Sequence, residues 1–127
     1  MANLYIQATK YTPEVNFDEQ SYIMNISGKS YPENTFQYYK PIIDWVESFL
    51  ANSQNKLITF NLDLEYLNSS SLKAYFDMFD ILEIAYENGK SISINWLFDK
   101  DNDIAQETGE DFIADFTKLN ISLIVKD

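Results

Sequence analysis

The sequence predicts an α/β fold in which a mixed β-sheet of about six strands carries three main helices. The second half of the chain alternates strand-like and helix-like hydrophobic patterns, which is typical of β-α-β units with parallel strands. The first half instead contains short strand-like stretches around a polar turn, which is typical of an antiparallel hairpin. The 127 residues, of which 46% are hydrophobic, are expected to form a single domain over residues 1–127.

Three strands are expected before the first helix. Their apolar residues alternate with more polar neighbours at Leu4, Ile6 and Ala8, at Val15 and Phe17, and at Tyr22, Met24 and Ile26. Residues 18–20 are expected to form the hairpin turn, and Gly28 is expected to end the third strand.

The first helix is expected to begin near Ser30, because Ser30 and Glu33 have the spacing of a capping box and Pro32 would lie in the first turn. Pro41 falls inside the expected helix and has no backbone N–H to donate to Gln37. We therefore expect a kink or a fresh start at Pro41, followed by apolar residues at helical spacing up to residue 50.

The remaining elements alternate between strand and helix. Strands are expected over residues 58–64, 92–98 and 121–125, an amphipathic helix over residues 72–86 with a stop at Asn88-Gly89, and a third helix over residues 110–118. The third helix is expected to bury Phe112, Ile113 and Phe116.

Composition excludes several classes of function. The chain contains no Cys and no His, so disulfides, thiol nucleophiles, common zinc sites and Ser-His catalysis are excluded, and no metal or cofactor is expected. A formal net charge of −11 disfavours binding to nucleic acid or to anionic membranes. The N-terminal residues lack a signal-peptide pattern and no apolar run could span a bilayer, so a cytoplasmic protein is expected.

The most informative motif is Asn68-Ser69-Ser70-Ser71, between an expected strand and an expected helix. Hydroxyls at that point can cap the helix by accepting hydrogen bonds from its free N–H groups. They can also receive a phosphate, whose charge would be favoured by the same donors and by the positive end of the helix dipole. The sequence leaves both roles open.

An acidic segment could in principle bind calcium. Asp99, Asp101, Asp103 and Glu110 occupy positions 1, 3, 5 and 12 of a calcium-loop template, but position 6, which requires Gly, is Ile104. A solvated acidic loop is the favoured interpretation, and a calcium-binding module is kept as an alternative function.

Two pairs of carboxylates, Asp63 with Glu65 and Asp77 with Asp80, could serve acid/base chemistry. Neither pair has a nucleophile, a His or a glycine-rich loop nearby, so a non-enzymatic protein is expected.

Four aromatic residues follow no clear periodicity: Tyr31, Phe36, Tyr38 and Tyr39. They could form a partner-binding patch, since aromatic residues are enriched in interfaces, or they could pack around Pro41.

Three short motifs and one tryptophan resemble the SiaC family of bacterial regulatory phosphoproteins. They are Tyr31-Pro32-Glu33-Asn34, Asn68-Ser69-Ser70-Ser71-Leu72-Lys73, Trp96 and Gly109-Glu110. The resemblance extends from Thr12 to Phe116, and the strand-hydroxyl-helix arrangement is more distantly similar to the STAS domains of anti-sigma-factor antagonists.

The resemblance implies a STAS-like mixed sheet and a partner-switching mechanism. Family members are phosphorylated by a dedicated kinase, a PP2C-type phosphatase reverses this, and the unmodified form binds and activates a diguanylate cyclase. The family pattern is Asn-Thr-Ser-Ser, so the modified Thr corresponds to Ser69, with Ser70 as a second candidate. Residues expected to bind the partner are Asn68, Ser69, Ser70, Ser71, Tyr31, Glu33 and Asn34.

The physical chemistry of a phosphate agrees with this mechanism. A phosphate adds about −1.5 to −2 charges. The helix N-terminus should tolerate that charge, whereas a partner surface would have to desolvate it at high cost. An anti-sigma-factor antagonist would use the same switch with an anti-sigma factor as its partner, and this remains the second hypothesis.

Overall fold

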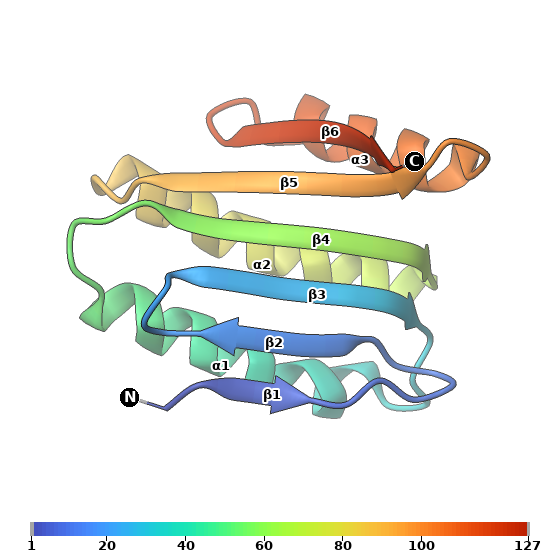
Figure 1. Cartoon of the computed structure of the whole chain (residues 1–127), viewed down its shortest axis with the longest axis horizontal. Helices are drawn as coiled ribbons and strands as arrows, with labels where there is room; N and C mark the ends of the chain where they lie inside the picture. Colours follow the sequence, from blue (N-terminus) through green and yellow to red (C-terminus); the bar gives the residue numbers. More distant parts are fainter. Residues whose placement is uncertain (1, 127) are drawn as a thin grey trace.

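The computed structural model describes residues 2–126 and contains six strands and three helices. The elements in chain order are β1 (Leu4–Ile6), β2 (Glu14–Asp18), β3 (Ile23–Ser30), α1 (Thr35–Asn52), β4 (Ile58–Leu67), α2 (Ser69–Glu87), β5 (Ile92–Asp99), α3 (Asp103–Asp115) and β6 (Asn120–Lys126) (Figure 1). Within the described residues, no helix is both long enough and apolar enough to cross a membrane.

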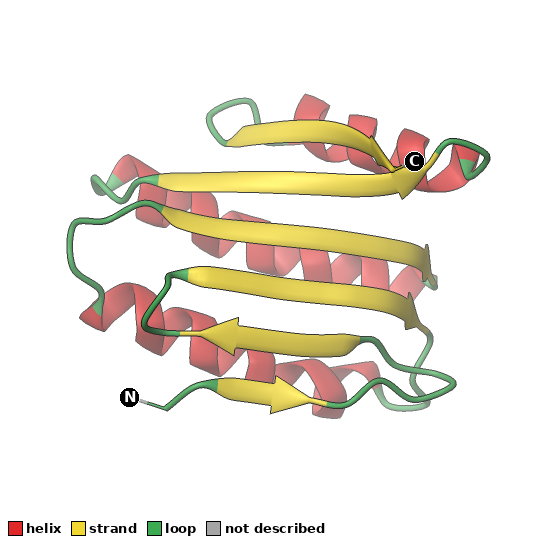
Figure 2. Ribbon diagram, viewed as in Figure 1, coloured by secondary structure: helices red, strands yellow, loops and turns green. Residues whose placement is uncertain are grey.

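The strands form one sheet in the order β1-β2-β3-β4-β5-β6. The pairs β1–β2 and β2–β3 are antiparallel, while β3–β4, β4–β5 and β5–β6 are parallel. All three helices lie on the same face of this sheet (Figure 2). The mixed sheet, the N-terminal hairpin and the parallel β-α-β units predicted from hydrophobic periodicity are therefore confirmed.

The core lies between the sheet and the helices. Alternate residues of the central strands are fully buried, as in Phe60 of β4 and Trp96 of β5. Phe112 of α3 packs against three aromatic rings of α2 and β5, with centroid distances of 4.5 Å to Phe76, 4.5 Å to Phe79 and 5.2 Å to Trp96.

The opposite face of the sheet is open and carries a row of asparagines. Asn16, Asn25, Asn61 and Asn95 are in register across β2, β3, β4 and β5. The Asn95 amide donates to Asn61 Oδ1 at 2.8 Å, and the Asn61 amide donates to Asn25 Oδ1 at 2.9 Å. Because side chains on one strand alternate between faces, the buried apolar positions place these polar residues toward solvent.

The structure corrects two expectations around the first helix. Gly28 does not end β3, since the strand continues to Ser30 past an irregularity between Gly28 and Lys29, where Gly28 has a φ of +124°. The prediction of a capping box at Ser30 is wrong as well, because Ser30 still pairs with β4 and Asn34 caps α1. The Ser30 side chain is fully buried in the core, so it is not available for a cap.

The structure corrects two further expectations about the helices. Of the kink or fresh start expected at Pro41, the fresh start does not occur, because α1 runs unbroken from Thr35 to Asn52. Gln37 and Pro41 are both exposed, so water can satisfy the carbonyl that lacks a donor. α3 begins at Asp103, seven residues before the expected Glu110, and Ile113 on it is 36% exposed rather than buried.

Candidate functional site

The three helix N-termini lie along one side of the molecule, following the carboxyl ends of β3, β4 and β5 (Figure 1). Each helix is capped by an asparagine whose side-chain oxygen accepts a hydrogen bond from the third helical residue. The distances are 3.0 Å from Gln37 N to Asn34, 2.9 Å from Ser71 N to Asn68, and 3.0 Å from Ala105 N to Asn102. In parallel sheets this side is where ligands and partners usually bind.

Ser69 is the first residue of α2, and its side chain is exposed. Within residues 2–126 its hydroxyl has no hydrogen-bond partner, since the cap is made by Asn68 instead. The first turn of α2 contains no acidic residue. A free hydroxyl therefore lies at the positive end of a 19-residue helix with no negative charge in its first turn.

Ser70 is also exposed, but its hydroxyl is already engaged. Its Oγ lies 2.6 Å from Thr35 Oγ1 at the start of α1 and 3.3 Å from Asn68 Oδ1. This hydrogen bond ties the first turns of α1 and α2 together. A kinase would have to break it before it could modify Ser70, whereas Ser69 needs no such step.

The side chain of Ser71, which was expected to bind the partner, is fully buried. Its Oγ is hydrogen bonded to Ser30 Oγ at 2.7 Å, and Ser30 Oγ is bonded to the Tyr39 hydroxyl at 2.7 Å. The Tyr39 hydroxyl in turn donates to the Tyr75 hydroxyl at 3.2 Å. Ser71 can thus shape the surface only from beneath, by fixing the first turn of α2.

This chain of four buried hydroxyls joins β3, α1 and α2 below the exposed serines. Burial raises the pKa of Tyr39, and it raises the pKa of Tyr75 well above its usual value, so both groups stay neutral at physiological pH. No buried side-chain polar atom among the described residues lacks a partner. A fully satisfied buried network of this kind makes the turn rigid.

The other residues expected to bind a partner lie close to this turn. Asn34 is the cap of α1, one residue before the Thr35 that bonds Ser70. Tyr31 is half-buried, and its ring packs edge-on against Tyr66 of β4 with centroids 5.9 Å apart. Glu33 is exposed in the loop that connects β3 to α1. The expected residues thus cluster around the N-termini of α1 and α2.

Two exposed apolar side chains flank the serines. Phe36 is 76% exposed and Ile104 is 74% exposed, and they occupy the second helical positions of α1 and α3, as Ser70 does in α2. Phe36 was one of the aromatics left open by the sequence. The sequence indicated Ile104 only as a mismatch to the calcium template. Its exposure could not be predicted, because it depends on where α3 begins.

A groove of about 410 Å³ separates α1 from α2 beside Ser70. Phe36 and Ile43 of α1 and Ala74 of α2 supply apolar contacts in it. Two ion pairs also line it, between Lys40 and Asp44 at 2.9 Å and between Lys73 and Asp77 at 3.1 Å.

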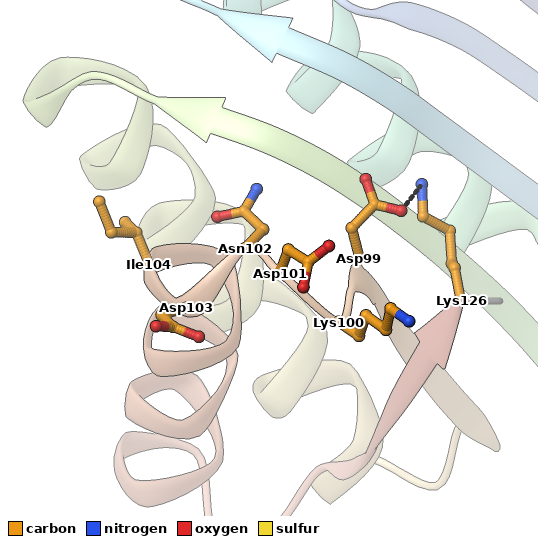
Figure 3. Close-up of a pocket in the computed structure, with 7 residues that line it drawn as sticks. All are labelled: Asp99, Lys100, Asp101, Asn102, Asp103, Ile104 and Lys126. Carbon is orange, nitrogen blue, oxygen red and sulfur yellow. Dashed lines mark ion pairs between the residues drawn. The ribbon is translucent and has the colours of Figure 1, made fainter.

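The calcium template does not form a loop. Asp103 is the first residue of α3, and residues 103–110 are helical, so Glu110 cannot fold back toward Asp99. Asp99 is directed toward Lys126, 3.8 Å away, whereas Asp103 points away from it (Figure 3). Among the described residues no cluster of three candidate metal ligands is present.

Lys126 of β6 also pairs with a carboxylate of β4, across the intervening strand β5. Its Nζ lies 2.8 Å from Asp63 Oδ2, and this hydrogen bond raises the pKa of Lys126. Asp63, one of the carboxylates weighed for catalysis, is thus half of an ion pair.

Comparison with known proteins identifies the family. The chain matches the SiaC family of regulatory phosphoproteins over residues 6–126, and it belongs to that family. An uncharacterised protein of Pseudomonas aeruginosa strain UCBPP-PA14 is 41% identical over 115 residues, which cover 91% of this chain and 90% of that protein.

Solved structures agree with this assignment. SiaC of Pseudomonas aeruginosa superposes with a TM-score of 0.91 at 35% identity, covering 99% of this chain and 100% of that one. SiaC in complex with the diguanylate cyclase SiaD, of which it is the activator, superposes with a TM-score of 0.91 at 36% identity, covering 97% and 99%.

Proposed function

We propose that this chain is a non-enzymatic signalling switch whose unmodified form binds and activates a diguanylate cyclase. Phosphorylation of Ser69 by a partner kinase blocks the binding, and a PP2C-type phosphatase restores it. The observation that carries the proposal is the exposed, unbonded Ser69 hydroxyl at the first position of α2. A cytoplasmic location is part of the proposal, because the phosphoryl donor and the cyclase substrate are both nucleotides found there.

Family membership and the complex of the homologue SiaC with SiaD support the cyclase as the partner rather than an anti-sigma factor. The structure explains how a phosphate could change binding without unfolding the protein. Asn68 already caps α2 and Ser71 anchors its first turn, so neither function depends on the Ser69 hydroxyl. The dianion would be stabilised by the helix dipole and would stay in water until a partner tried to desolvate it.

The docking edge in this proposal comprises Asn68, Ser69, Ser70, Tyr31, Glu33 and Asn34, with Ser71 holding it from below. The exposed Phe36 beside Ser70 is a suitable apolar anchor for the partner, since aromatic side chains are enriched among residues that dominate binding energy.

Binding of the purified chain to a SiaD-type cyclase from the same genome, measured by calorimetry together with cyclic di-GMP synthesis, tests the proposal. We expect Ser69→Ala to bind and activate normally, and protein carrying phosphoserine at position 69 to lose binding at least tenfold. Ser48→Asp, which adds a charge at an exposed site on α1, is the control and should bind normally. Equal binding of the phosphorylated and unmodified proteins would overturn the proposal.

A further inference from the structure

Lys73 lies between two possible acidic partners on α2. It follows Ser69 by four residues and precedes Asp77 by four, so the three side chains are successive neighbours along the helix surface. In the unmodified protein the Lys73 ammonium donates to both carboxylate oxygens of Asp77, at 3.2 and 3.1 Å. Lys73 is the only basic residue of α2.

The orientation of the existing pair is the weaker one. An ion pair in which the acid precedes the lysine by four residues stabilises a helix more than the reverse pair does, because the former arrangement agrees with the helix dipole. Asp77 follows Lys73, whereas a phosphate on Ser69 would precede it. The phosphate would also carry about −1.5 to −2 charges against −1 for the carboxylate.

We propose that Lys73 exchanges partners when Ser69 is phosphorylated, leaving the carboxylate of Asp77 for the phosphate. This inference rests on the phosphorylation of Ser69 proposed above. Lys73, the only basic residue of α2, then responds directly to the phosphate on Ser69.

The exchange changes the charge of the groove between α1 and α2. Its four charged side chains, Lys40, Asp44, Lys73 and Asp77, balance in the unmodified protein, although acidic residues outnumber basic ones 20 to 9 in the whole chain. When Lys73 turns to the phosphate, Asp77 loses its partner in the groove and the phosphate adds further charge at the rim. A partner that fits the balanced groove then meets the unpaired carboxylate of Asp77 and the excess negative charge of the phosphate.

The test uses full-length protein with phosphoserine at position 69, and follows the second pKa of that phosphate by phosphorus NMR. A cation beside the phosphate favours its dianion, so it lowers this pKa. Lys73→Gln should raise it by about 0.2 to 0.4 unit, as expected for a helical charge pair, and Lys73→Arg should restore it. Asp77→Asn should lower it by less than Lys73→Gln raises it, because an Asp77 that Lys73 has already left competes only weakly.

Lys118→Gln is the matched control, since Lys118 pairs with Glu87 at the far end of α2 at 3.2 Å and loses the same charge. If Lys73→Gln shifts the phosphate pKa no more than Lys118→Gln does, the exchange does not occur. If Asp77→Asn lowers the pKa by more than Lys73→Gln raises it, Asp77 still holds Lys73 in the phosphorylated protein, and the inference is equally overturned. Neither result depends on the cyclase, so failure of partner control alone would leave the exchange standing.

Discussion

The units β4–α2 and β5–α3 share one backbone design and carry opposite chemistry in the first turn of the helix. Both helices follow a parallel strand and are capped by an asparagine at 2.9 or 3.0 Å. At the first helical position one has Ser69 and the other Asp103. The α3 N-terminus therefore already has a negative charge at its positive dipole end, while that of α2 has none.

The third helical position differs in how it is anchored. Ser71 is held through its hydroxyl by Ser30 on β3, so the first turn of α2 is fixed by polar contacts. Ala105 at the same position of α3 has no such group, and its carbonyl accepts a hydrogen bond from Trp96 Nε1 at 2.9 Å. The contrast teaches that the first turn of α2 is held by the Asn68 cap and the Ser71 hydroxyl, so that the Ser69 hydroxyl is not needed to anchor it.

The largest effect is expected where α3 approaches the sheet. A Cβ at Gly109 would lie 2.6 Å from Cδ1 of the fully buried Trp96 and 2.6 Å from Cδ2 of the partly buried Leu123. Gly109→Ala should therefore lower the free energy of unfolding by about 1–3 kcal/mol through overpacking. Urea unfolding followed by Trp fluorescence measures this, with the exposed Asp111→Ala as control. An unchanged midpoint would mean that α3 is not tightly seated.

The two caps should differ in strength. Asn68→Ala and Asn102→Ala each remove a cap and should destabilise the protein by about 0.5–2 kcal/mol. Asn102→Ala should cost more, because the Asn102 amide also donates to the Glu65 carbonyl at 3.0 Å, whereas the second bond of Asn68, from Ser70 Oγ, is longer at 3.3 Å. Thermal unfolding of both variants, with the Ser variants as controls that keep an acceptor, gives the comparison. Equal losses would mean that the contact with Glu65 contributes no more than the contact between Ser70 and Asn68.

The buried hydroxyls beneath α2 should respond to alkaline pH. Tyr75→Phe removes one end of the chain and should cost about 0.5–1.5 kcal/mol at neutral pH. The pKa values of Tyr39 and Tyr75 are raised in the folded state, so their contribution is complete below about pH 10 and is lost as pH rises above it.

Urea midpoints of the wild type should therefore fall above about pH 10, and those of Tyr75→Phe should fall less steeply. Tyr86→Phe, on the exposed side of α2, is the control. Parallel curves for the wild type and Tyr75→Phe would show that this hydroxyl does not titrate with unfolding.

The smallest effect is expected from exchanging the first helical residues. Ser69→Asp should stabilise α2 and Asp103→Ser should destabilise α3, each by about 0.3–1 kcal/mol at low ionic strength. Chemical unfolding at low and high salt is the measurement, and both effects should shrink with salt. If Asp103→Ser instead stabilises the protein, repulsion from Asp99 and Asp101 outweighs the dipole at α3.

Most of the fold could be predicted because hydrophobic periodicity is local. The strands around Phe60 and Trp96 and the helix that stops before Asn88-Gly89 are where the pattern placed them, and Gly89 has a positive φ of +102°. The residues at which the helices begin were harder to predict. Ser30 satisfied a capping pattern that was never used, because its hydroxyl is bonded to Ser71, 41 residues away.

The candidate site could also be predicted only in part. Three successive serines at a strand-to-helix junction identified the candidate position, and the resemblance selected Ser69 among them. The sequence held no signal that Ser70 is bonded to Thr35 or that Ser71 is buried. Exposure of Ile104 was missed for a related reason, since it depends on α3 beginning seven residues early.

The order of elements, the acidic charge and the presence of hydroxyls at the start of α2 follow from the amino-acid sequence, because each depends on residue types and spacings within one segment. Which hydroxyl is free, which is bonded and which is buried follows from contacts between α1, β3 and α2. Such contacts join residues far apart in the chain, and they exist only after the helices have packed on the sheet.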